Sequence, residues 1–284
     1  MSEIIDFSTP ETRERLAARY ARLTLRAHER PSSPAHAVRI AGHLCGWATQ
    51  AACDALQGLP DVELTPDTLH IGPGHPSGAT LDACLAQVAW TLREAHCLRG
   101  WRDELLDVRG PQGVVGRIER AACRPLGLRT LAVHLNAWTP DGQVWIARRA
   151  QTKSTDPGMW DTLVGGLVGA GEDPDLALTR ECDEEAGLEP ADIAARAPLR
   201  TILRMHRRLP EGYQVEDLLV ADCVLQPDVV PRNRDGEVSE IRSVPVAELL
   251  TMLDDGAFTL EAALVLVEDM MRCASPRGSQ PRSA

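Results

Sequence analysis

The sequence predicts a two-domain protein of mixed α and β structure, and three observations support this class. The chain has 284 residues, and 44% of them are hydrophobic, which is enough for two folded cores. Some segments repeat apolar residues every three or four positions, as amphipathic helices do, whereas others are short apolar runs between turn residues, as strands are. Both patterns occur on either side of about residue 126, where we place the domain boundary.

The first 125 residues are expected to form a small α/β module. Residues 11–29 predict a surface helix, because leucines and alanines recur at helical spacing with charges opposite, and residues 1–37 are a helical extension and linker. Residues 79–96 carry a continuous apolar stripe and predict a buried helix. Between these helices we expect a hairpin, a short helix and two short strands, over residues 38–47, 48–57 and 62–71.

The second domain is expected to span residues 126–274. The segments LAVHLNAW and VWIAR flank the turn TPDG and predict a hairpin. A loop is expected at QPDVVPRNRDGE, and the polar, proline-bearing tail at 275–284 is expected to be disordered. Further strands are expected at 199–206 and 215–225, and a last helix from about 260 to 272.

Charge and cysteine usage exclude several classes of partner. The net charge is −11, so the overall field repels nucleic acids and anionic membranes, and any bound phosphate needs local cations. No apolar run is long enough to span a bilayer, and the N-terminus is acidic and polar, unlike a secretion signal. The eight cysteines form no CxxC pair, which is typical of reduced, buried thiols. We therefore expect a cytoplasmic protein.

The stretch GGLVGAGEDPDLALTRECDEEAGL, residues 165–188, predicts a glycine-rich loop followed by a helix. Asp173 and Pro174 are a typical helix start, and Gly187 is a typical stop in the left-handed conformation. Leu178 and Ala186 lie on one side of this helix, together with Cys182, and are expected to face the core.

Three carboxylates lie largely on the other side of the same helix. Glu181 and Glu185 are one turn apart, and Glu184 lies beside them. Like charges at this spacing repel, so they favour a cation between them, and oxygen ligands suit Mg²⁺ or Mn²⁺. The preceding glycines let a backbone carbonyl approach such a metal closely. The stretch is therefore a candidate metal site.

This pattern resembles the Nudix box at each of its fixed positions, with Cys182 standing where the family has an aliphatic residue. The resemblance implies a Nudix α/β/α sandwich with a mixed sheet, in which the box forms a strand, loop and helix. It also implies metal-dependent hydrolysis of a nucleoside diphosphate linked to another moiety. The positions that carry it are Gly166, Glu172, Arg180, Glu181, Glu184, Glu185, Gly187 and Leu188.

The resemblance also assigns roles within the box. Glu181, Glu184 and Glu185 match the family's metal ligands, with a carbonyl near Gly166 as a further one. Glu172 and Arg180 match the residues that hold the loop against the helix, and Glu172 sometimes joins the metal shell.

The general base is not fixed by the box. The family often uses a glutamate outside or at the edge of it, and Glu237 and Glu240 lie in the polar segment RDGEVSEIRSV, before the final strand and helix. Glu181 is the alternative base.

Four residues near the box are candidate substrate contacts. Arg148, Arg149 and Lys153 follow a predicted strand, where they either bind diphosphate oxygens or form a solvated basic edge. Trp160 either stacks on a ring of the substrate or anchors the strand that enters the box.

Softer motifs resemble one branch of the family. The segments TDPGMWDTLVGG, EGYQVEDLLVADCVL and RNRDGEVSEIRSVPVAELL are similar to Nudix proteins related to thiamine pyrophosphokinases. The segment from VRIAGHLCGWAT to LRGWRDELLDV resembles the domain of unknown function that precedes them. The resemblance implies a small-molecule diphosphate with a heteroaromatic part, such as thiamine diphosphate or a damaged analogue. The N-terminal module then caps the substrate mouth or mediates a homodimer.

Two alternatives have the same fold. An isopentenyl-diphosphate isomerase resembles the chain around GMWDTLVGG, but its proton chemistry uses a cysteine in a motif that this chain lacks, and Cys223 in a predicted strand is a poor substitute. A noncatalytic Nudix-fold binding module typically loses box carboxylates, and all of them are present here.

Overall fold

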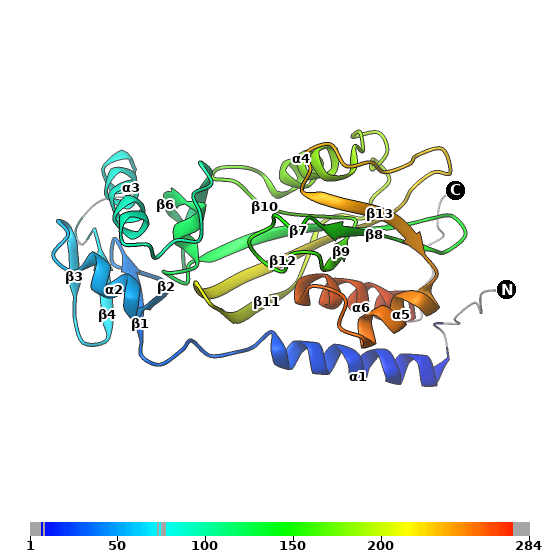
Figure 1. Cartoon of the computed structure of the whole chain (residues 1–284), viewed down its shortest axis with the longest axis horizontal. Helices are drawn as coiled ribbons and strands as arrows, with labels where there is room; N and C mark the ends of the chain where they lie inside the picture. The colour runs from blue at the N-terminus through cyan, green and yellow to red at the C-terminus, as the bar shows by residue number, and fades with distance from the viewer. Residues whose placement is uncertain (1–6, 8, 73, 75–77, 275–284) are drawn as a thin grey trace.

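The computed structural model describes residues 7, 9–72, 74 and 78–274, which fold into two packed parts (Figure 1). The N-terminal part has a four-stranded sheet in the order β2-β1-β4-β3, and a separate hairpin, β5–β6. One continuous core joins this sheet, both helices and the hairpin, and it extends to Leu128. Its elements are β1 (Ala35–Ile40), β2 (His43–Thr49), α2 (Gln50–Leu56), β3 (Val62–Leu64), β4 (Thr68–Ile71), α3 (Ala79–Glu94), β5 (Leu105–Gly110), β6 (Gly113–Glu119) and the 3₁₀ turn η1 (Arg120–Cys123).

The C-terminal part is built on a mixed seven-stranded sheet. Its main order is β11-β12-β7-β8-β13, with β10 paired to β7 and β9 paired to β8. Strands β7 and β12 run parallel, and the other pairs are antiparallel. The strands are β7 (Arg129–Trp138), β8 (Val144–Arg149), β9 (Trp160–Thr162), β10 (Val164–Leu167), β11 (Arg200–Leu209), β12 (Gly212–Val224) and β13 (Val238–Val244), and the helices are α4 (Pro174–Ala186), α5 (Val246–Asp254) and α6 (Leu260–Ala274).

Helices cover both faces of this sheet, which gives the expected sandwich (Figure 1). Successive side chains of a strand point to opposite faces. Val133 and Leu135 of β7 therefore pack with Leu178 of α4. Ala132, on the other face, packs with Leu264 of α6. The mixed α/β sandwich predicted from the sequence is confirmed.

The first helix, α1 (Pro10–Arg26), packs against the C-terminal part although it precedes the N-terminal module. Leu16 is buried in the core formed by α5, α6 and the neighbouring strands. Arg19 binds Asp254 at the end of α5 through two hydrogen bonds. Helix α1 thus lies with the C-terminal part in space, and the chain then runs to β1 at the other end of the molecule (Figure 1).

Backbone contacts fix the N-terminal module to the box loop. The amide of Ala170 donates to the carbonyl of Leu105 in β5 at 2.8 Å. The amide of Gly171 donates to Oδ1 of Asp107 at 3.0 Å. Both contacts come from a hairpin that the sequence analysis did not predict, and they set the position of the module against the loop.

Some elements differ from the sequence expectations. Helix α5 and the hairpin β5–β6 were not predicted, although both carry a sequence signal. Val246, Leu249 and Leu253 recur at helical spacing in α5, and the turn residues GPQG at 110–113 separate the two apolar runs of the hairpin. Glu240 was placed in a polar loop, but it lies within β13, opposite Arg148 of β8. The tail at 275–284, expected to be disordered, lies outside the described residues. Within the described part of the chain, no helix is both long and apolar enough to cross a membrane.

Candidate functional site

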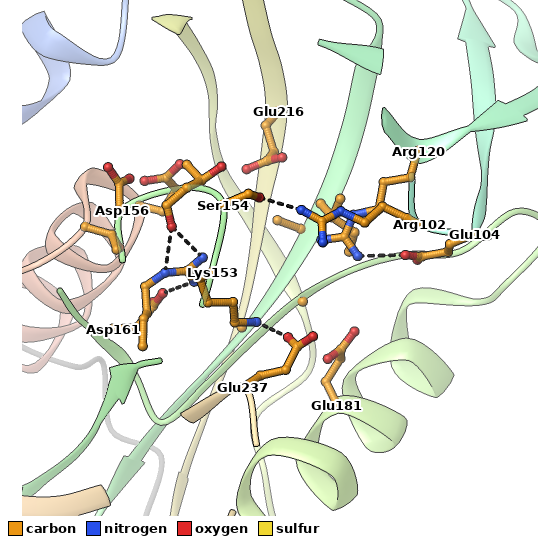
Figure 2. Close-up of a pocket in the computed structure, with 18 of the residues that line it drawn as sticks. Arg102, Glu104, Arg120, Lys153, Ser154, Asp156, Asp161, Glu181, Glu216 and Glu237 are labelled. Atoms are coloured by element: carbon orange, nitrogen blue, oxygen red, sulfur yellow. Dashed lines mark hydrogen bonds and ion pairs between the residues drawn. The ribbon is translucent and has the colours of Figure 1, made fainter. Parts of the chain in front are cut away.

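A cavity of about 590 Å³ lies where the sheet, helix α4 and the N-terminal module meet (Figure 2). Gly165 and Gly166 of β10 form part of its wall, and Glu181 and Glu184 of α4 reach it from one side. Arg120, together with its neighbours in the N-terminal module, lines the opposite side. The cavity therefore joins the candidate metal site to a part of the chain far away in sequence.

Helix α4 begins and ends as its sequence predicts. Asp173 accepts a hydrogen bond from the amide of Asp175 at 2.9 Å, and Pro174 occupies the first turn. Gly187 ends the helix at a φ of 62°, and a Cβ at this position would lie 2.8 Å from the carbonyl oxygen of Arg232. These two ends fix which residues of the helix reach the cavity.

Arg180 ties the helix to the loop before it. Its guanidinium donates two hydrogen bonds of 3.0 Å to Glu172 and one of 3.2 Å to the carbonyl of Leu167. Glu172 also accepts from the amide of Gly169 at 2.9 Å. Hydrogen bonding from Arg180 lowers the pKa of Glu172, so the pair stays charged. The geometry is that of a clamp that holds the loop against the helix.

The same guanidinium also contacts two candidate metal ligands. Nη1 of Arg180 lies 2.8 Å from Oε1 of Glu181 and 3.2 Å from Oε2 of Glu184. Gly166 makes room for Glu181, because a Cβ on Gly166 would lie 2.0 Å from the carboxyl carbon of Glu181. Burial raises the pKa of Glu181 against the opposing effect of Arg180. A glycine at this position is therefore a steric requirement of the site.

Glu185 faces a different set of partners from Glu181 and Glu184. Only 5% of it is exposed, and its Oε2 accepts from the amide of Gly165 at 2.9 Å. Lys153 lies 3.6 Å from Oε1 of Glu185 and also pairs with Glu237. Burial raises the pKa of Glu185 to about 7, although Lys153 opposes this shift. Glu185 was expected to lie largely on the polar side of the helix, but in the structure it is buried against strand β10 of the sheet.

Two acids from a distant loop join Glu185. One carboxylate oxygen each from Glu185, Asp235 and Glu237 lie within 4.8 Å of one another, close enough to hold one cation. From the sequence, Glu185 was expected to converge on one point with Glu181 and Glu184, and not with Asp235 and Glu237. In this structure Glu181 and Glu184 bind Arg180, whereas Glu185 lies beside Lys153. The three acids therefore form two neighbouring groups.

Strand alternation separates the other candidates. Arg148, Trp160 and Glu240 lie side by side across β8, β9 and β13, and none of them lines the cavity. Trp160 packs into the core beneath α5 and α6, with the guanidinium of Arg242 at 4.9 Å from its ring centre. Arg149, the next residue of β8, points to the other face and lines the cavity, where it binds Asp161.

Three arginines of the cavity were not among the sequence candidates. Arg102 and Arg120 come from the N-terminal module, and Arg124 follows η1. Arg120 binds Glu104 at 2.6 Å and remains 41% exposed, whereas Arg102 donates to the hydroxyl of Ser154 (Figure 2). Arginine is common throughout this chain, so no sequence signal marks these three; only the docking of the module brings them to the site.

Comparison with known proteins supports the family resemblance. A sequence model of the NUDIX domain matches residues 128–264. Nudix hydrolase 20 of Arabidopsis thaliana, described as chloroplastic, is 33% identical over 194 residues, covering 66% of this chain and 52% of that protein. An uncharacterized Nudix hydrolase of Pseudomonas aeruginosa is 34% identical over 130 residues, covering 46% of this chain and 71% of that protein.

The chain therefore belongs to the Nudix hydrolase family. It spans about half the length of the curated relatives it matches first, 52% and 55% of two Arabidopsis proteins. A crystal structure of a Deinococcus radiodurans protein aligns with 61% of this chain and 100% of its own, at 27% identity and a TM-score of 0.45.

Proposed function

We propose that the protein is a divalent-metal-dependent hydrolase of a diphosphate bond in a small molecule. The observation that carries this proposal is the cavity itself, which is lined by Glu181 and Glu184 of the box and by cationic side chains from the N-terminal module, the sheet and α4. Diphosphate cleavage mainly requires that a water molecule be positioned and that phosphoryl charge be neutralised. Acids that hold a metal and arginines that bind phosphate are the groups this reaction needs.

The donor set fits Mg²⁺ or Mn²⁺. Both ions prefer oxygen ligands, and the candidate ligands are carboxylates and a backbone carbonyl. We assign Glu181, Glu184, Glu185 and the carbonyl near Gly166 as ligands, and the cradle that Gly166 leaves for Glu181 supports this assignment. When bound, such an ion neutralises phosphoryl charge and makes a bound water more acidic. Asp235 joins the set through its proximity to Glu185.

The remaining roles go to residues of the cavity. Glu172 and Arg180 position the loop and helix. Arg120 and Arg102 bind the diphosphate from the N-terminal side, which gives the module the role of capping the substrate mouth. Arg149 and Lys153 face the substrate from the sheet, whereas Arg148 and Trp160 lie outside the cavity and are not retained as contacts.

Of the acids considered as the general base, Glu237 is favoured over Glu240. Glu237 lines the cavity, 55% of its side chain is exposed, and it lies beside Glu185. Glu240 instead contacts Arg148 and Arg242 outside the cavity. Glu181 remains the alternative, because burial raises its pKa toward the range useful for proton transfer.

The substrate that we propose is a diphosphate with a heteroaromatic part, either thiamine-diphosphate-like or nucleoside-linked. The support is the resemblance to the thiamine-related branch together with the cavity volume of about 590 Å³, which suits one small ligand. The eight free cysteines support a reducing compartment, as in the cytoplasm.

The isomerase alternative finds no support in the cavity. Its chemistry needs a cysteine at the site, and no cysteine lines the cavity among the residues that the structure describes. Cys223 lies on the α4 face of the sheet, where burial raises its pKa to about 12. The binding-module alternative is disfavoured because every box carboxylate is retained.

The test is phosphate or monophosphate release from a panel of diphosphates, with Mg²⁺, with Mn²⁺ and with a chelator. The panel contains thiamine diphosphate, oxidised thiamine diphosphates, ADP-ribose, NADH and dinucleoside polyphosphates. We expect metal-dependent release, highest for the thiamine compounds. A preference for ADP-ribose or NADH would support the hydrolase proposal but contradict the proposed thiamine-diphosphate-like substrate. No release from a folded, metal-binding sample would favour the noncatalytic binding module.

A further inference from the structure

The inner end of the cavity is lined by polar side chains that the proposed hydrolysis does not use. His134 lies on β7, Gln214 lies on β12, and both line the cavity. They are almost fully buried, with 4% and 1% of each residue exposed. Nε2 of His134 and Oε1 of Gln214 have no hydrogen-bond partner among the described residues. Other buried polar atoms of the described residues also have no partner, but these two lie on the wall of the cavity, where a ligand can reach them.

The hydrogen bonds of His134 identify its free nitrogen as an acceptor. Nδ1 lies 3.0 Å from Oγ1 of Thr162, and this hydroxyl already donates its proton to the carbonyl of Val164 at 2.8 Å. Nδ1 must therefore carry the proton of the neutral ring, which leaves Nε2 unprotonated. Burial lowers the pKa of His134 and keeps the ring neutral.

The amide of Gln214 is oriented in a similar way. Its Nε2 donates to Glu216 at 2.8 Å and to Glu261 at 3.0 Å. Rotating the amide by half a turn would place its oxygen against these two acids, so Oε1 is the free atom and accepts hydrogen bonds. Oε2 of Glu261, also without a hydrogen bond, adds a further polar oxygen 3.6 Å from Arg207.

One donor and an apolar strip complete this end. Nη1 of Arg124 is buried without a partner, while its Nη2 binds Glu216 at 3.1 Å. Ala132 and Leu167 also line the cavity, and they are directly opposite each other in the β7–β10 pair. Two acceptors, a donor and an apolar strip match a flat ring that carries donor and acceptor groups along one edge.

We propose that His134 and Gln214 select substrates whose non-phosphate part is a nitrogen heterocycle with an exocyclic amino group. The N–H groups donate to Nε2 of His134 and Oε1 of Gln214, and a ring nitrogen accepts from Arg124. This inference rests on the proposed function in that it assigns the inner end to the group attached to the diphosphate. A ligand without the amino group leaves both buried acceptors unpaired, which is how a polar site rejects an analogue.

The test compares substrate pairs that differ only in the amino group. The pairs are thiamine diphosphate with the analogue carrying hydrogen in place of the pyrimidine amino group, and ADP-ribose with its purine counterpart. We expect kcat/KM to fall by about tenfold or more when the amino group is lost. In Gln214→Leu and in His134→Phe, we expect the ratio within the preferred pair to fall severalfold, because each variant removes one of the two acceptors.

A matched control is available on the same strand. Asn136 lies two residues from His134 on the same face of β7, is equally buried, and does not line the cavity. Asn136→Leu should keep the wild-type ratio. If one of the two cavity variants does not fold, the other carries the comparison, and Gln214→Met provides a second apolar replacement of similar volume at that position.

Binding measurements separate this inference from the proposed function. Calorimetry measures the affinity of the unmodified chain for each compound of both pairs, with chelator present to prevent turnover. If no diphosphate is hydrolysed, the hydrolase proposal fails, yet tighter binding of an amino compound that is weakened in both variants still supports the inference. Equal affinity within both pairs, or a preference that is unchanged in Gln214→Leu and His134→Phe, overturns it.

Discussion

The two ends of the cavity differ in whether their polar side chains have partners within the protein. At the α4 end, Arg180 alone contacts three carboxylates, Glu172, Glu181 and Glu184. At the inner end, His134 Nε2 and Gln214 Oε1 have no partner among the described residues. The first end holds its geometry through internal ion pairs, whereas the second is complete only with a ligand. This contrast indicates that chemistry and recognition are assigned to different ends of one cavity.

The two ends also differ in how far apart in the sequence their residues lie. Arg180 and the three carboxylates that it contacts at the α4 end come from one stretch, 165–188, and form local contacts along a loop and a helix. The inner end takes its residues from β7, β12 and α6, which are far apart in the chain. Each prediction below perturbs one side of this contrast, in order of decreasing expected effect.

Removing one charge at the α4 end should have the largest effect. Glu184→Gln keeps the shape of the side chain but removes a negatively charged oxygen from the proposed metal site. We expect turnover to fall by about a hundredfold or more while the fold persists. The measurement is kcat with Mg²⁺, together with the thermal unfolding midpoint.

Asp183→Asn is the control for Glu184→Gln. Asp183 precedes Glu184 in α4 but pairs with Arg234 and does not line the cavity. It should keep wild-type turnover. Unchanged turnover in folded Glu184→Gln protein would remove Glu184 from the ligand set.

A methyl group at Gly166 should displace a neighbouring carboxylate. The Cβ of Gly166→Ala would lie 2.0 Å from the carboxyl carbon of Glu181, so that side chain must move. We expect turnover to fall by about tenfold or more, since active-site groups tolerate little displacement. The atoms nearest to this Cβ belong to the end of the Glu181 side chain and not to the backbone, so we expect only a small change in the free energy of unfolding.

A double-mutant cycle with Glu181→Asp checks this cause. The shorter side chain already withdraws from Gly166, so the two changes together should lower turnover little more than Glu181→Asp alone. Fully additive losses would mean that Gly166 acts independently of Glu181.

The N-terminal side of the cavity should affect substrate affinity. Arg120→Ala removes a guanidinium that donates a hydrogen bond to Glu104 and is 41% exposed. We expect KM for the diphosphate to rise by about tenfold, with a smaller rise for Arg120→Lys, which keeps the charge but loses the fork geometry. The measurement is steady-state kinetics on the best substrate of the panel.

Arg39→Ala is the matched control for Arg120, since Arg39 belongs to the same module and contacts the carbonyl of Gly42 away from the cavity. Equal KM values for Arg120→Ala and Arg39→Ala would argue that the module only supports the fold.

A buried carboxylate away from the cavity, Asp269, should affect the free energy of unfolding without affecting the site. Asp269 of α6 is 2% exposed and accepts from the indole of Trp138 at 2.8 Å. Burial, reinforced by Asp222, raises its pKa from 3.8 to about 6. Between these values the folded state holds more protons than the unfolded chain, so this group makes the free energy of unfolding decrease as pH rises.

Asp269→Asn cannot titrate and should lose this decrease. We expect the variant to be more stable than the wild type at pH 7 by on the order of 1 kcal/mol, since loss of the charge near Arg272 offsets part of the gain. Urea unfolding at several pH values between about 4 and 7 measures both slopes. Parallel slopes would show that Asp269 does not titrate in this range.

The sequence predicted the local parts of this protein well. Asp173, Pro174 and Gly187 bound helix α4 as expected, because caps and helix periodicity depend on neighbouring residues only. The Nudix box lies within one loop and one helix, so the spacing of its residues could be read from the sequence. This local pattern was enough to identify the family and, through it, the mixed sandwich. The hairpin β5–β6 and helix α5 were missed although both have local signals, the turn GPQG at 110–113 and the helical spacing of Val246, Leu249 and Leu253.

Tertiary structure alone decided how the candidates divide between the cavity and other surfaces. Neighbouring residues Arg148 and Arg149 look alike in sequence, but the pairing of β8 sends only Arg149 to the cavity. Docking of the N-terminal module brings Arg120 to the site, and strand pairing places His134 beside Gly165. A sequence by itself determines contacts between near neighbours, whereas burial and the partners of a side chain depend on which distant elements pack against it.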